Sequence, residues 1–325
     1  ARNAELVALT ARTPERAEQL RRKHGAKRAY TSEEELLRDP EVDAVYIATP
    51  VAEHYREGTL AAQAGKHILM EKPLTVSADE TKALIDCCEA HKVAFGAGFM
   101  MRFGTHVQSM RQAVLDGRIG TVLSGTANFT LWMPYQSGVW RLQKKNGGGA
   151  LMDMGIHCLD LISFITGMRV TEVAAMNENV LFRDPGYEVE DSSAVLLRME
   201  NGAQFFVQSS FNIPYAEAKW HLNLFGSKGR LMGDNILGQE DTGTLNLIDA
   251  DMLPTLEPRP QTGYGQGRMC PAVFGNLYTR EIESFSESVL CETPLEVPAT
   301  QALEVQRVVD AAYRSSREKR IISLL

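Results

Sequence analysis

The sequence lacks the features that mark several classes of protein. Its five cysteines include no C-x-x-C pair, which argues against a disulfide framework and favours reduced thiols. Lys and Arg form no run dense enough to follow a phosphate backbone, and the net charge is −7, so nucleic acid is disfavoured as a partner. No uninterrupted apolar segment is long enough to span a membrane, and the first residues do not form a signal peptide. These absences predict a cytoplasmic protein without a membrane partner.

The first hundred residues alternate between short β-rich runs and segments with helix-capping signals. Examples of these signals are Thr13-Pro14 and Ser77-x-x-Glu80. Such alternation predicts parallel strands joined by right-handed crossovers, in a sheet that binds ligands at the carboxyl ends of its strands. The predicted strands are residues 5–10, 42–49, 67–70 and 93–98, and helices are predicted to start near residues 13, 32, 53 and 77.

A dinucleotide-binding sheet normally opens with a strand and a G-x-G-x-x-G turn, and that turn is missing here. The strand at residues 5–10 instead resembles the second strand of such a unit. We therefore expect the first strand, its glycine turn and the first helix to be absent from the sequence as given. A parallel sheet without a central strand exposes apolar edges, so the 325-residue chain alone is predicted to be poorly stable.

After Gly117 the pattern changes to runs with the period-two alternation of antiparallel strands. Asn201-Gly202 lies between two of these runs and predicts a type I′ hairpin turn. A Pro/Gly-rich surface loop is predicted at 253–267, with helices at 272–290 and 299–317. The predicted strands are residues 121–131, 170–176, 192–199, 203–211, 219–225 and 244–248.

The 325 residues, of which 44% are hydrophobic, are enough for two domains with separate cores. We predict an α/β plus α+β protein. Residues 1–103 form a Rossmann-like NAD(P)-binding domain that is incomplete at its N-terminus. Residues 104–325 form a substrate-binding and oligomerisation domain, with an open, mostly antiparallel sheet of about six strands covered on one face by helices. The uncovered sheet face predicts a homodimer or homotetramer.

Residues 147–160 combine three glycines with an apolar helix that carries an acid and an imidazole. Asp153 and His157 are four residues apart, which places both on one face of an α-helix, and Gly167 is the predicted C-cap. This pair is a candidate catalytic site. It is equally compatible with an ordinary helical pair or with a core histidine satisfied by the acid. A metal site is less favoured, because no further His or Cys cluster lies at ligand spacing.

Two motifs follow neighbouring predicted parallel strands, at the sheet edge where ligands bind. Ala48-Thr49-Pro50, with His54 one helical turn later, follows one strand, and Glu71-Lys72-Pro73 follows the next. A lone lysine is usually a solvated surface residue. A lysine held at a strand end by the following proline can instead be aimed into a crevice, where it can polarise a substrate oxygen.

Thr10 and Arg12 lie at the end of the first predicted strand. An NAD-binding fold usually has an acid there for the ribose 2′-hydroxyl, whereas a hydroxyl residue with a nearby arginine suits a 2′-phosphate. NADP is therefore the preferred cofactor, with NAD as the second choice. The alternative for Arg12 is a solvated arginine at a helix start.

In order and approximate spacing, these motifs resemble those of the glucose-fructose oxidoreductase, inositol dehydrogenase and rhizopine-catabolism (Gfo/Idh/MocA) family. The resemblance rests on Ala48-Thr49-Pro50 with His54, on Glu71-Lys72-Pro73, and on Gly147-Gly148-Gly149 leading to Asp153 and His157. The stretch at 311–316 also resembles the family's last helix. The resemblance covers essentially the whole chain apart from the missing start. It implies an NAD(P)-dependent dehydrogenase or reductase that acts on a secondary alcohol or ketone of a sugar, cyclitol or dihydrodiol-like substrate.

The resemblance also implies roles for individual residues. His157 would exchange the hydroxyl proton, Lys72 would hydrogen-bond the reacting oxygen, and Asp153 would orient the substrate or the imidazole. The three glycines would let the loop approach a bound nicotinamide closely. Arg102 and Tyr278 are weaker candidates for the substrate pocket. The predicted cofactor-binding residues are Thr10, Arg12, Ala48, Thr49, Pro50, His54, Glu71, Lys72, Trp140 and Arg141, with core packing as the alternative for Trp140.

Two other functions stay open on the sequence alone. A non-catalytic NAD(P)-sensing regulator on the same fold would be expected to have lost the lysine or the histidine, and both are present. A metal-dependent hydrolase would use Asp153 and His157 as zinc ligands, although no metal is predicted.

Overall fold

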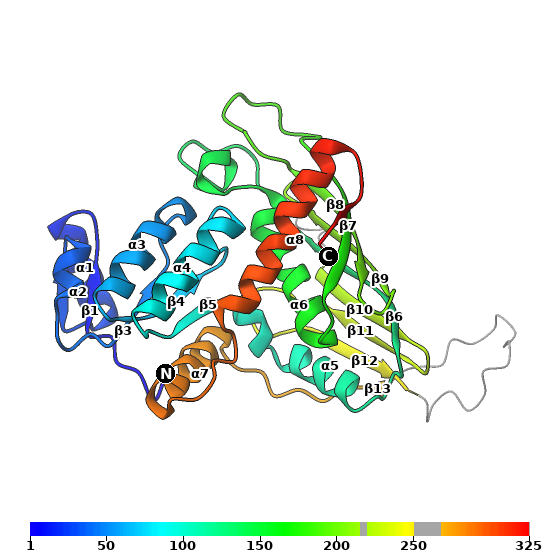
Figure 1. Cartoon of the computed structure of the whole chain (residues 1–325), viewed down its shortest axis with the longest axis horizontal. Helices are drawn as coiled ribbons and strands as arrows, with labels where there is room; N and C mark the ends of the chain where they lie inside the picture. Colours follow the sequence, from blue (N-terminus) through cyan, green and yellow to red (C-terminus); the bar gives the residue numbers. More distant parts are fainter. Residues whose placement is uncertain (215–219, 250–267, 325) are drawn as a thin grey trace, which may run out of the picture. The chain divides into compact units, whose positions relative to one another are not determined.

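The computed structural model describes residues 1–214, 220–249 and 268–324, and the chain divides into two compact units (Figure 1). The first unit contains Ala1–Phe99 and Tyr278–Glu304, and the second contains Met100–Leu277 and Val305–Leu325. The segment Tyr278–Glu304 thus groups with the N-terminal unit, whereas the domain boundary predicted from the sequence put all residues after 103 in the second domain. The predicted loop at 253–267 lies outside the described residues.

The first unit alternates strands and helices, as predicted. Its five parallel strands form two sheets, with the orders β1-β2 and β3-β4-β5. The helices begin where the sequence signals a cap: the side chains of Thr13, Ser32 and Ser77 each accept a hydrogen bond from a backbone N–H three residues later. The elements are β1 (Ala8–Thr10), α1 (Pro14–His24), β2 (Arg28–Tyr30), α2 (Glu33–Leu37), β3 (Ala44–Ile47), α3 (Val51–Gln63), β4 (His67–Glu71), α4 (Ala78–Ala90) and β5 (Phe95–Gly98).

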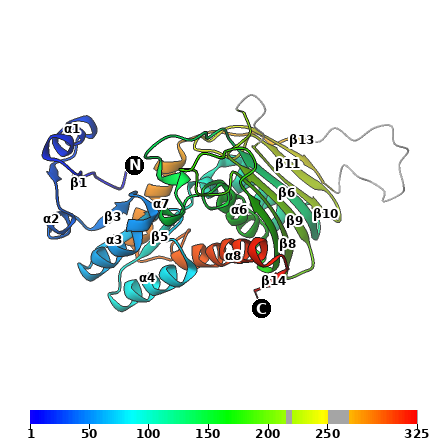
Figure 2. The same cartoon turned by 90° about the horizontal axis from the view of Figure 1, so that it is seen from above.

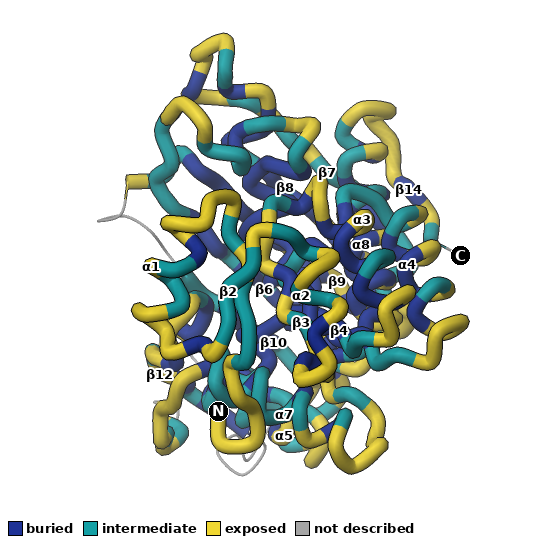
Figure 3. Tube along the Cα trace, turned by 90° about the vertical axis from the view of Figure 1, so that its left-hand side faces the viewer, coloured by how far each residue is buried: buried dark blue, intermediate teal, exposed yellow. Residues whose placement is uncertain are grey.

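The N-terminal part of this unit is thinly covered. Strand β2 was missed by sequence analysis because its three residues form no apolar run. Residues in β1, α1 and β2 are mostly half-buried or exposed (Figure 3). Tyr46 on β3, an edge strand of its sheet, is 43% exposed, whereas parallel strands are normally covered on both faces.

The C-terminal segment of the first unit joins the sheet at β5. The Ala97 N–H donates to the Val297 carbonyl over 2.9 Å. Helix α7 (Leu277–Cys291) packs Phe285 so closely on Gly96 that a Cβ at that glycine would lie 2.9 Å from the ring. The helix starts later than predicted because Gly275-Asn276, two poor helix formers, precede it.

The second unit contains a nine-stranded sheet in the order β13-β12-β11-β10-β6-β9-β8-β7-β14. All neighbours are antiparallel except the parallel pair β6 and β9, which confirms the mostly antiparallel fold class. The count of about six strands was too low, since β11, β13 and β14 were missed. The strands are β6 (Val122–Thr130), β7 (Val170–Glu178), β8 (Ser192–Met199), β9 (Gln204–Ser210), β10 (Trp220–Gly226), β11 (Arg230–Asp234), β12 (Thr244–Ile248), β13 (Arg268–Met269) and β14 (Ile322–Ser323).

Helices cover one face of this sheet (Figures 1 and 2). They are α5 (Thr105–Leu115), α6 (Ile156–Thr166) and the part of α8 (Ala299–Glu318) that belongs to this unit. Gly167 ends α6 in the left-handed conformation, as predicted. One helical stretch among the described residues, Lys144–Thr166, is long and apolar enough to cross a membrane, and 94% of its most apolar window is buried inside the structure. A buried core helix has the same composition.

The hairpin between β8 and β9 is confirmed, but the predicted type I′ turn is wrong. A type I′ turn needs positive φ at both central residues, and only Gly202, at +88°, has it. The Gly202 N–H donates to the Met199 carbonyl, and the Met199 N–H donates to the Ala203 carbonyl. These bonds are typical of a three-residue loop that ends in a left-handed glycine.

Candidate active site

The two motifs at the strand ends of the first unit lie side by side. Strands β3 and β4 pair in parallel, with Ile47 opposite Met70. The segments at their carboxyl ends, Ala48-Thr49-Pro50 and Glu71-Lys72-Pro73, are therefore adjacent at the carboxyl edge of the sheet. Ala48 and Thr49 are exposed and Lys72 is half-buried. The structure thus brings these predicted residues together, as parallel pairing requires.

His54 joins these two turns. It lies in the first turn of α3, is only 1% exposed, and its Nδ1 is 3.0 Å from the Pro73 carbonyl while its Nε2 is 2.9 Å from the Thr49 carbonyl. A neutral imidazole can donate from one of these nitrogens, and only the protonated ring donates from both. Burial lowers the pKa of His54, against the opposing effect of the carbonyl contacts. Because its ring faces two backbone carbonyls, His54 holds the two turns together.

Acidic groups surround the same edge. Glu71 accepts a hydrogen bond from the Tyr46 hydroxyl at 2.5 Å and from the Lys72 N–H at 3.2 Å. Thr49 donates its hydroxyl to Glu57 at 2.5 Å. Burial raises the pKa of Glu57 to about 7. Glu57 is thus poised to change its charge near neutral pH.

Glu281 on α7 was missed by sequence analysis. It is 2% exposed, and its carboxyl oxygens have no hydrogen-bond partner in the described part of the chain. Burial, and secondarily the charge of Glu71, raise its pKa to about 8. The signal in the sequence was its place in an apolar stripe, between Leu277 and Phe285 at four-residue spacing.

Thr10 and Arg12 lie at the carboxyl end of β1, and both are exposed. The Arg12 side chain makes no hydrogen bond or ion pair with another described residue. Arg28, at the start of neighbouring β2, is instead held by Asp39 at 2.6 Å. Arg12 is therefore the arginine in this pair of strands that remains available to an anion.

In the second unit, the structure brings together Trp140, Arg141 and Asp153. The Arg141 guanidinium lies 4.6 Å from the centroid of the Trp140 ring, and its Nε is 3.1 Å from an Asp153 carboxylate oxygen. The Asp153 side chain is buried, while that of Arg141 is 40% exposed. This contact links the predicted cofactor-binding pair to the predicted catalytic helix, and the sequence did not anticipate it.

The helix that carries Asp153 and His157 does not begin as an α-helix. Residues Leu151–Gly155 form a π-turn in which the Ile156 N–H bonds to the Leu151 carbonyl, and α6 follows. The α-helical geometry expected for the pair is therefore altered, because a π-turn inserts an extra residue per turn. His157 is 3% exposed, with its ring edge-on to Phe129 at 6.1 Å between centroids. Such π-turns occur frequently at functional sites.

Two of the three glycines before this turn, Gly148 and Gly149, are required by their neighbours in the chain itself. A Cβ on Gly148 would lie 2.2 Å from the Arg141 carbonyl oxygen. A Cβ on Gly149 would lie 2.5 Å from a carboxyl oxygen of Glu190, and Gly149 has a φ of +125°. Neighbouring residues thus already occupy the space beside these two glycines, and the close approach of a nicotinamide to this loop stays a prediction.

The two weaker candidates, Arg102 and Tyr278, belong to different units. Arg102 is 2% exposed and forms a buried ion pair with Asp160, with Nη2 2.5 Å from a carboxylate oxygen. It also lies over the Phe164 ring at 4.8 Å, so its guanidinium is engaged in the core. Tyr278 belongs to α7 in the first unit and is close enough to Tyr46 to affect its ionisation.

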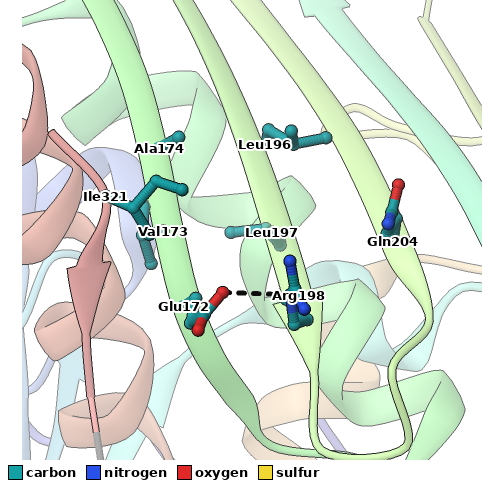
Figure 4. Close-up of a pocket in the computed structure, with 8 residues that line it drawn as sticks. All are labelled: Glu172, Val173, Ala174, Leu196, Leu197, Arg198, Gln204 and Ile321. Atoms are coloured by element: carbon teal, nitrogen blue, oxygen red, sulfur yellow. Dashed lines mark ion pairs between the residues drawn. The ribbon is translucent and has the colours of Figure 1, made fainter.

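A small hollow on the second unit's sheet contains none of the predicted residues (Figure 4). Its two charged side chains, Glu172 and Arg198, are paired with each other at 2.9 Å. Across the described residues, no group of three or more His, Cys, Asp or Glu side chains is arranged to hold a metal ion. The predicted site residues thus fall into two groups, the strand-end turns of the first unit and the segment around the π-turn of the second.

Comparison with known proteins matches both parts of the chain to one family. Residues 1–99 match the oxidoreductase family with an NAD-binding Rossmann fold, and residues 107–232 match the GFO/IDH/MocA C-terminal domain. The chain is 31% identical to the D-xylose 1-dehydrogenase (NADP(+)) 2 of Haloferax volcanii, covering 98% of this chain and 92% of that protein. It is 29% identical to the 1,5-anhydro-D-fructose reductase of Ensifer adhaerens, over 89% and 82% of the two chains.

A solved structure supports the same assignment. The aldose-aldose oxidoreductase of Caulobacter crescentus, complexed with glycerol, aligns with a TM-score of 0.86. The alignment covers 98% of this chain and 92% of that one, at 26% identity. The similarity therefore extends through both units.

Proposed function

The chain belongs to the Gfo/Idh/MocA family of NAD(P)-dependent oxidoreductases, and on that premise we propose that it transfers a hydride between NADP and a secondary alcohol or ketone of a sugar or cyclic polyol. The named relatives are a dehydrogenase and a reductase of sugars. The observation that carries the proposal is the buried π-turn with Asp153, tied to Arg141, and His157 four residues later.

His157 is the proposed general acid/base, because an imidazole titrates near neutral pH and can exchange the hydroxyl proton. Lys72 would donate a hydrogen bond to the reacting oxygen and favour the negative charge that develops there. Asp153, fixed by Arg141, would orient a substrate hydroxyl. When bound, the nicotinamide supplies the hydride acceptor or donor.

Arg12 and Thr10 support the preference for NADP. Both are exposed at the end of β1, and the Arg12 guanidinium has no partner among the described residues, which suits a ribose 2′-phosphate. Arg12→Ala is expected to raise the KM for NADP+ at least about tenfold and to leave the KM for NAD+ nearly unchanged. Arg38→Ala, at an exposed arginine, is the control. Equal effects on both cofactors would contradict the assignment.

The catalytic proposal is tested with Lys72→Ala and His157→Ala. Each is expected to lower kcat by about a hundredfold to ten-thousandfold, while NADPH binding measured by fluorescence stays within about twofold. Lys23→Ala and His24→Ala replace the same residue types at exposed positions and are expected to be silent. Full turnover in both Lys72→Ala and His157→Ala would contradict the proposal. If the wild type binds the cofactor but turns over no polyol, the alternative of a non-catalytic NAD(P)-sensing regulator would be favoured.

We also propose that the uncovered sheet face mediates self-association. Across the paired strands, Ala174, Leu196 and Phe206 lie in one row, and the last two are 48% and 44% exposed. Exposed contiguous apolar side chains favour burial against a partner, here a second copy. Leu196→Glu with Phe206→Glu is expected to give a monomer by light scattering, whereas Leu115→Glu, at an exposed position of α5, is not. A monomeric wild type at micromolar concentration would refute the proposal.

We propose a cytoplasmic location, supported by the five cysteines, all of which are free thiols. Fractionation of the native host, with blotting for the protein, tests it. Recovery in an oxidising compartment would contradict it.

A further inference from the structure

Glu190 contacts the start of the catalytic turn although it is far away in sequence. It precedes β8, is 9% exposed, and its Oε1 accepts a hydrogen bond from the Leu151 N–H at 2.9 Å. The Glu190 carbonyl also accepts the Ala150 N–H at 3.3 Å. Glu190 therefore holds the two residues at which the π-turn begins.

The Leu151 N–H needs such an acceptor. The first N–H groups of a helix have no partner within the helix, and Leu151 is fully buried, so water cannot replace the carboxylate. A negative charge at a helix N-terminus is also favoured by the helix dipole. Of the groups that follow, the Asp153 N–H is satisfied within the turn by the Gly149 carbonyl at 2.9 Å.

A second element fixes the carboxyl group from the other side. The Tyr313 hydroxyl, on α8, donates to the same Oε1 at 2.8 Å. Burial and the nearby Glu190 carboxyl raise the pKa of Tyr313, so it remains a neutral donor. A Cβ on Gly149 would collide with both groups, at 2.5 Å from Glu190 and 2.8 Å from the Tyr313 oxygen. The turn, the carboxyl and the phenol are thus in mutual contact.

We propose that Glu190 and Tyr313 are positioning residues that set the orientation of the π-turn, which bears Asp153 and leads directly into α6 with His157. The proposal rests on the function proposed above, in which His157 moves the proton. Neither residue was among the predicted site residues. Their effect on the reaction is indirect, through the backbone of the turn.

The ionisation of Glu190 offers a readout that a purely structural residue would lack. Burial raises its pKa to about 7, against the lowering effect of the Leu151 and Tyr313 hydrogen bonds. The other ionisable groups around it are Asp191, next in sequence, and Tyr313, beyond which lies Asp310. Only the ionised carboxylate makes charge-assisted bonds to both donors, so these two bonds are expected to strengthen as the pH rises through neutrality, while the desolvation cost of the buried charge lowers the overall stability.

The experiment compares Glu190→Gln, Glu190→Ala and Tyr313→Phe with an exposed control, Glu188→Gln. Glu190→Ala is expected to lower kcat by about tenfold to a hundredfold, because small misplacements of catalytic groups are costly, while NADPH affinity is unchanged. Glu190→Gln keeps an acceptor oxygen, so it is expected to restore most of kcat at pH 7 and to remove one ionisation near neutrality from the pH profile. Tyr313→Phe is expected to lower kcat a few-fold.

Amide hydrogen exchange supplies a test that does not depend on turnover. Glu190→Ala is expected to speed exchange in residues 149–157 and not in α1. Unchanged exchange together with unchanged kcat would overturn the inference. An unaltered pH profile in Glu190→Gln would overturn it even if Glu190→Ala fails to fold. A wild type without turnover, or an active His157→Ala, would instead overturn the proposed function.

Discussion

His54 in the first unit and Glu190 in the second hold the backbone of a site segment in chemically opposite ways. His54 reaches two carbonyl oxygens, those of Thr49 and Pro73, whereas Glu190 accepts an N–H and a hydroxyl. Turns that follow strands leave carbonyl groups without partners, and the start of a helix leaves N–H groups. The type of side chain at each position follows from the backbone groups that must be satisfied.

The same difference gives the two residues opposite effects on stability as the pH changes. Burial lowers the pKa of His54 below 6.5, so the unfolded chain binds more protons and stability is lost as the pH falls below that value. Burial raises the pKa of Glu190 from 4.5 to about 7, so the folded chain binds more protons between these values. Its contribution to stability is present below pH 4.5 and is lost as the pH rises to about 7.

The largest effect is expected from breaking the contact at Glu190 with Gly149→Ala. The new Cβ would lie 2.5 Å from Glu190 at a φ of +125°, so the free energy of unfolding is expected to fall by more than about 4 kcal/mol. Gly25→Ala is the control, since Gly25 also has positive φ, at +72°, but no neighbour within 4 Å. It is expected to lose about 1 kcal/mol in urea denaturation. Similar losses in both would show that backbone strain alone explains the requirement.

His54→Ala breaks the corresponding contact in the first unit. It leaves two carbonyl groups and a small cavity, which is expected to reduce the free energy of unfolding by about 3 kcal/mol and to raise the KM for the cofactor. His24→Ala, at an exposed histidine, is expected to change stability by less than about 0.5 kcal/mol. Urea denaturation and steady-state kinetics measure the two effects. A loss of stability no larger than that of the control would show that His54 does not hold the two turns together.

Glu190→Gln and His54→Gln test whether the two residues change the free energy of unfolding in opposite directions as the pH rises. Subtracting the stability of Glu190→Gln from that of the wild type is expected to give a difference that falls by at most about 3 kcal/mol between pH 4.5 and 7. The corresponding difference for His54→Gln is expected to rise with pH, starting below 6.5. Urea denaturation across this pH range measures both. Two differences that change in the same direction with pH would contradict these directions of the pKa shifts.

The smallest effect is expected from Thr49→Val, beside the His54 contact. Removing the hydroxyl that donates to Glu57 is expected to lower the free energy of unfolding by about 1 kcal/mol. The control is Thr59→Val, whose hydroxyl donates only to a carbonyl in its own helix, and a change within about 0.5 kcal/mol is expected. Thermal denaturation of the two variants measures the difference. Equal stabilities would show that the Thr49 hydroxyl does not hold Glu57.

Features set by nearby residues were predictable from the sequence. The caps at Thr13, Ser32 and Ser77 and the left-handed end at Gly167 depend on groups within a few residues, and all four are confirmed. The meeting of the two strand-end motifs followed from parallel pairing alone.

Features set by distant residues were not predictable. The π-turn is held by Glu190, 39 residues from its bonding partner Leu151, so no local pattern indicates it. The contact of Arg141 with Asp153 depends on how the loop folds back, and Arg102 carried no sign of its burial against Asp160. Short strands such as β2 and β11 have too few residues to show a period, because their partners define them.

The return of residues 278–304 to the first unit limits how the protein can be cut into pieces. The backbone passes between the units three times, so neither unit is a single continuous segment. A fragment that ends at residue 277 would remove Val297, which bonds to β5, and would uncover Gly96 beneath Phe285. A gene fragment that encodes the first unit therefore has to join residues 1–99 to residues 278–304. Exchanging this unit between relatives requires that both segments are exchanged together.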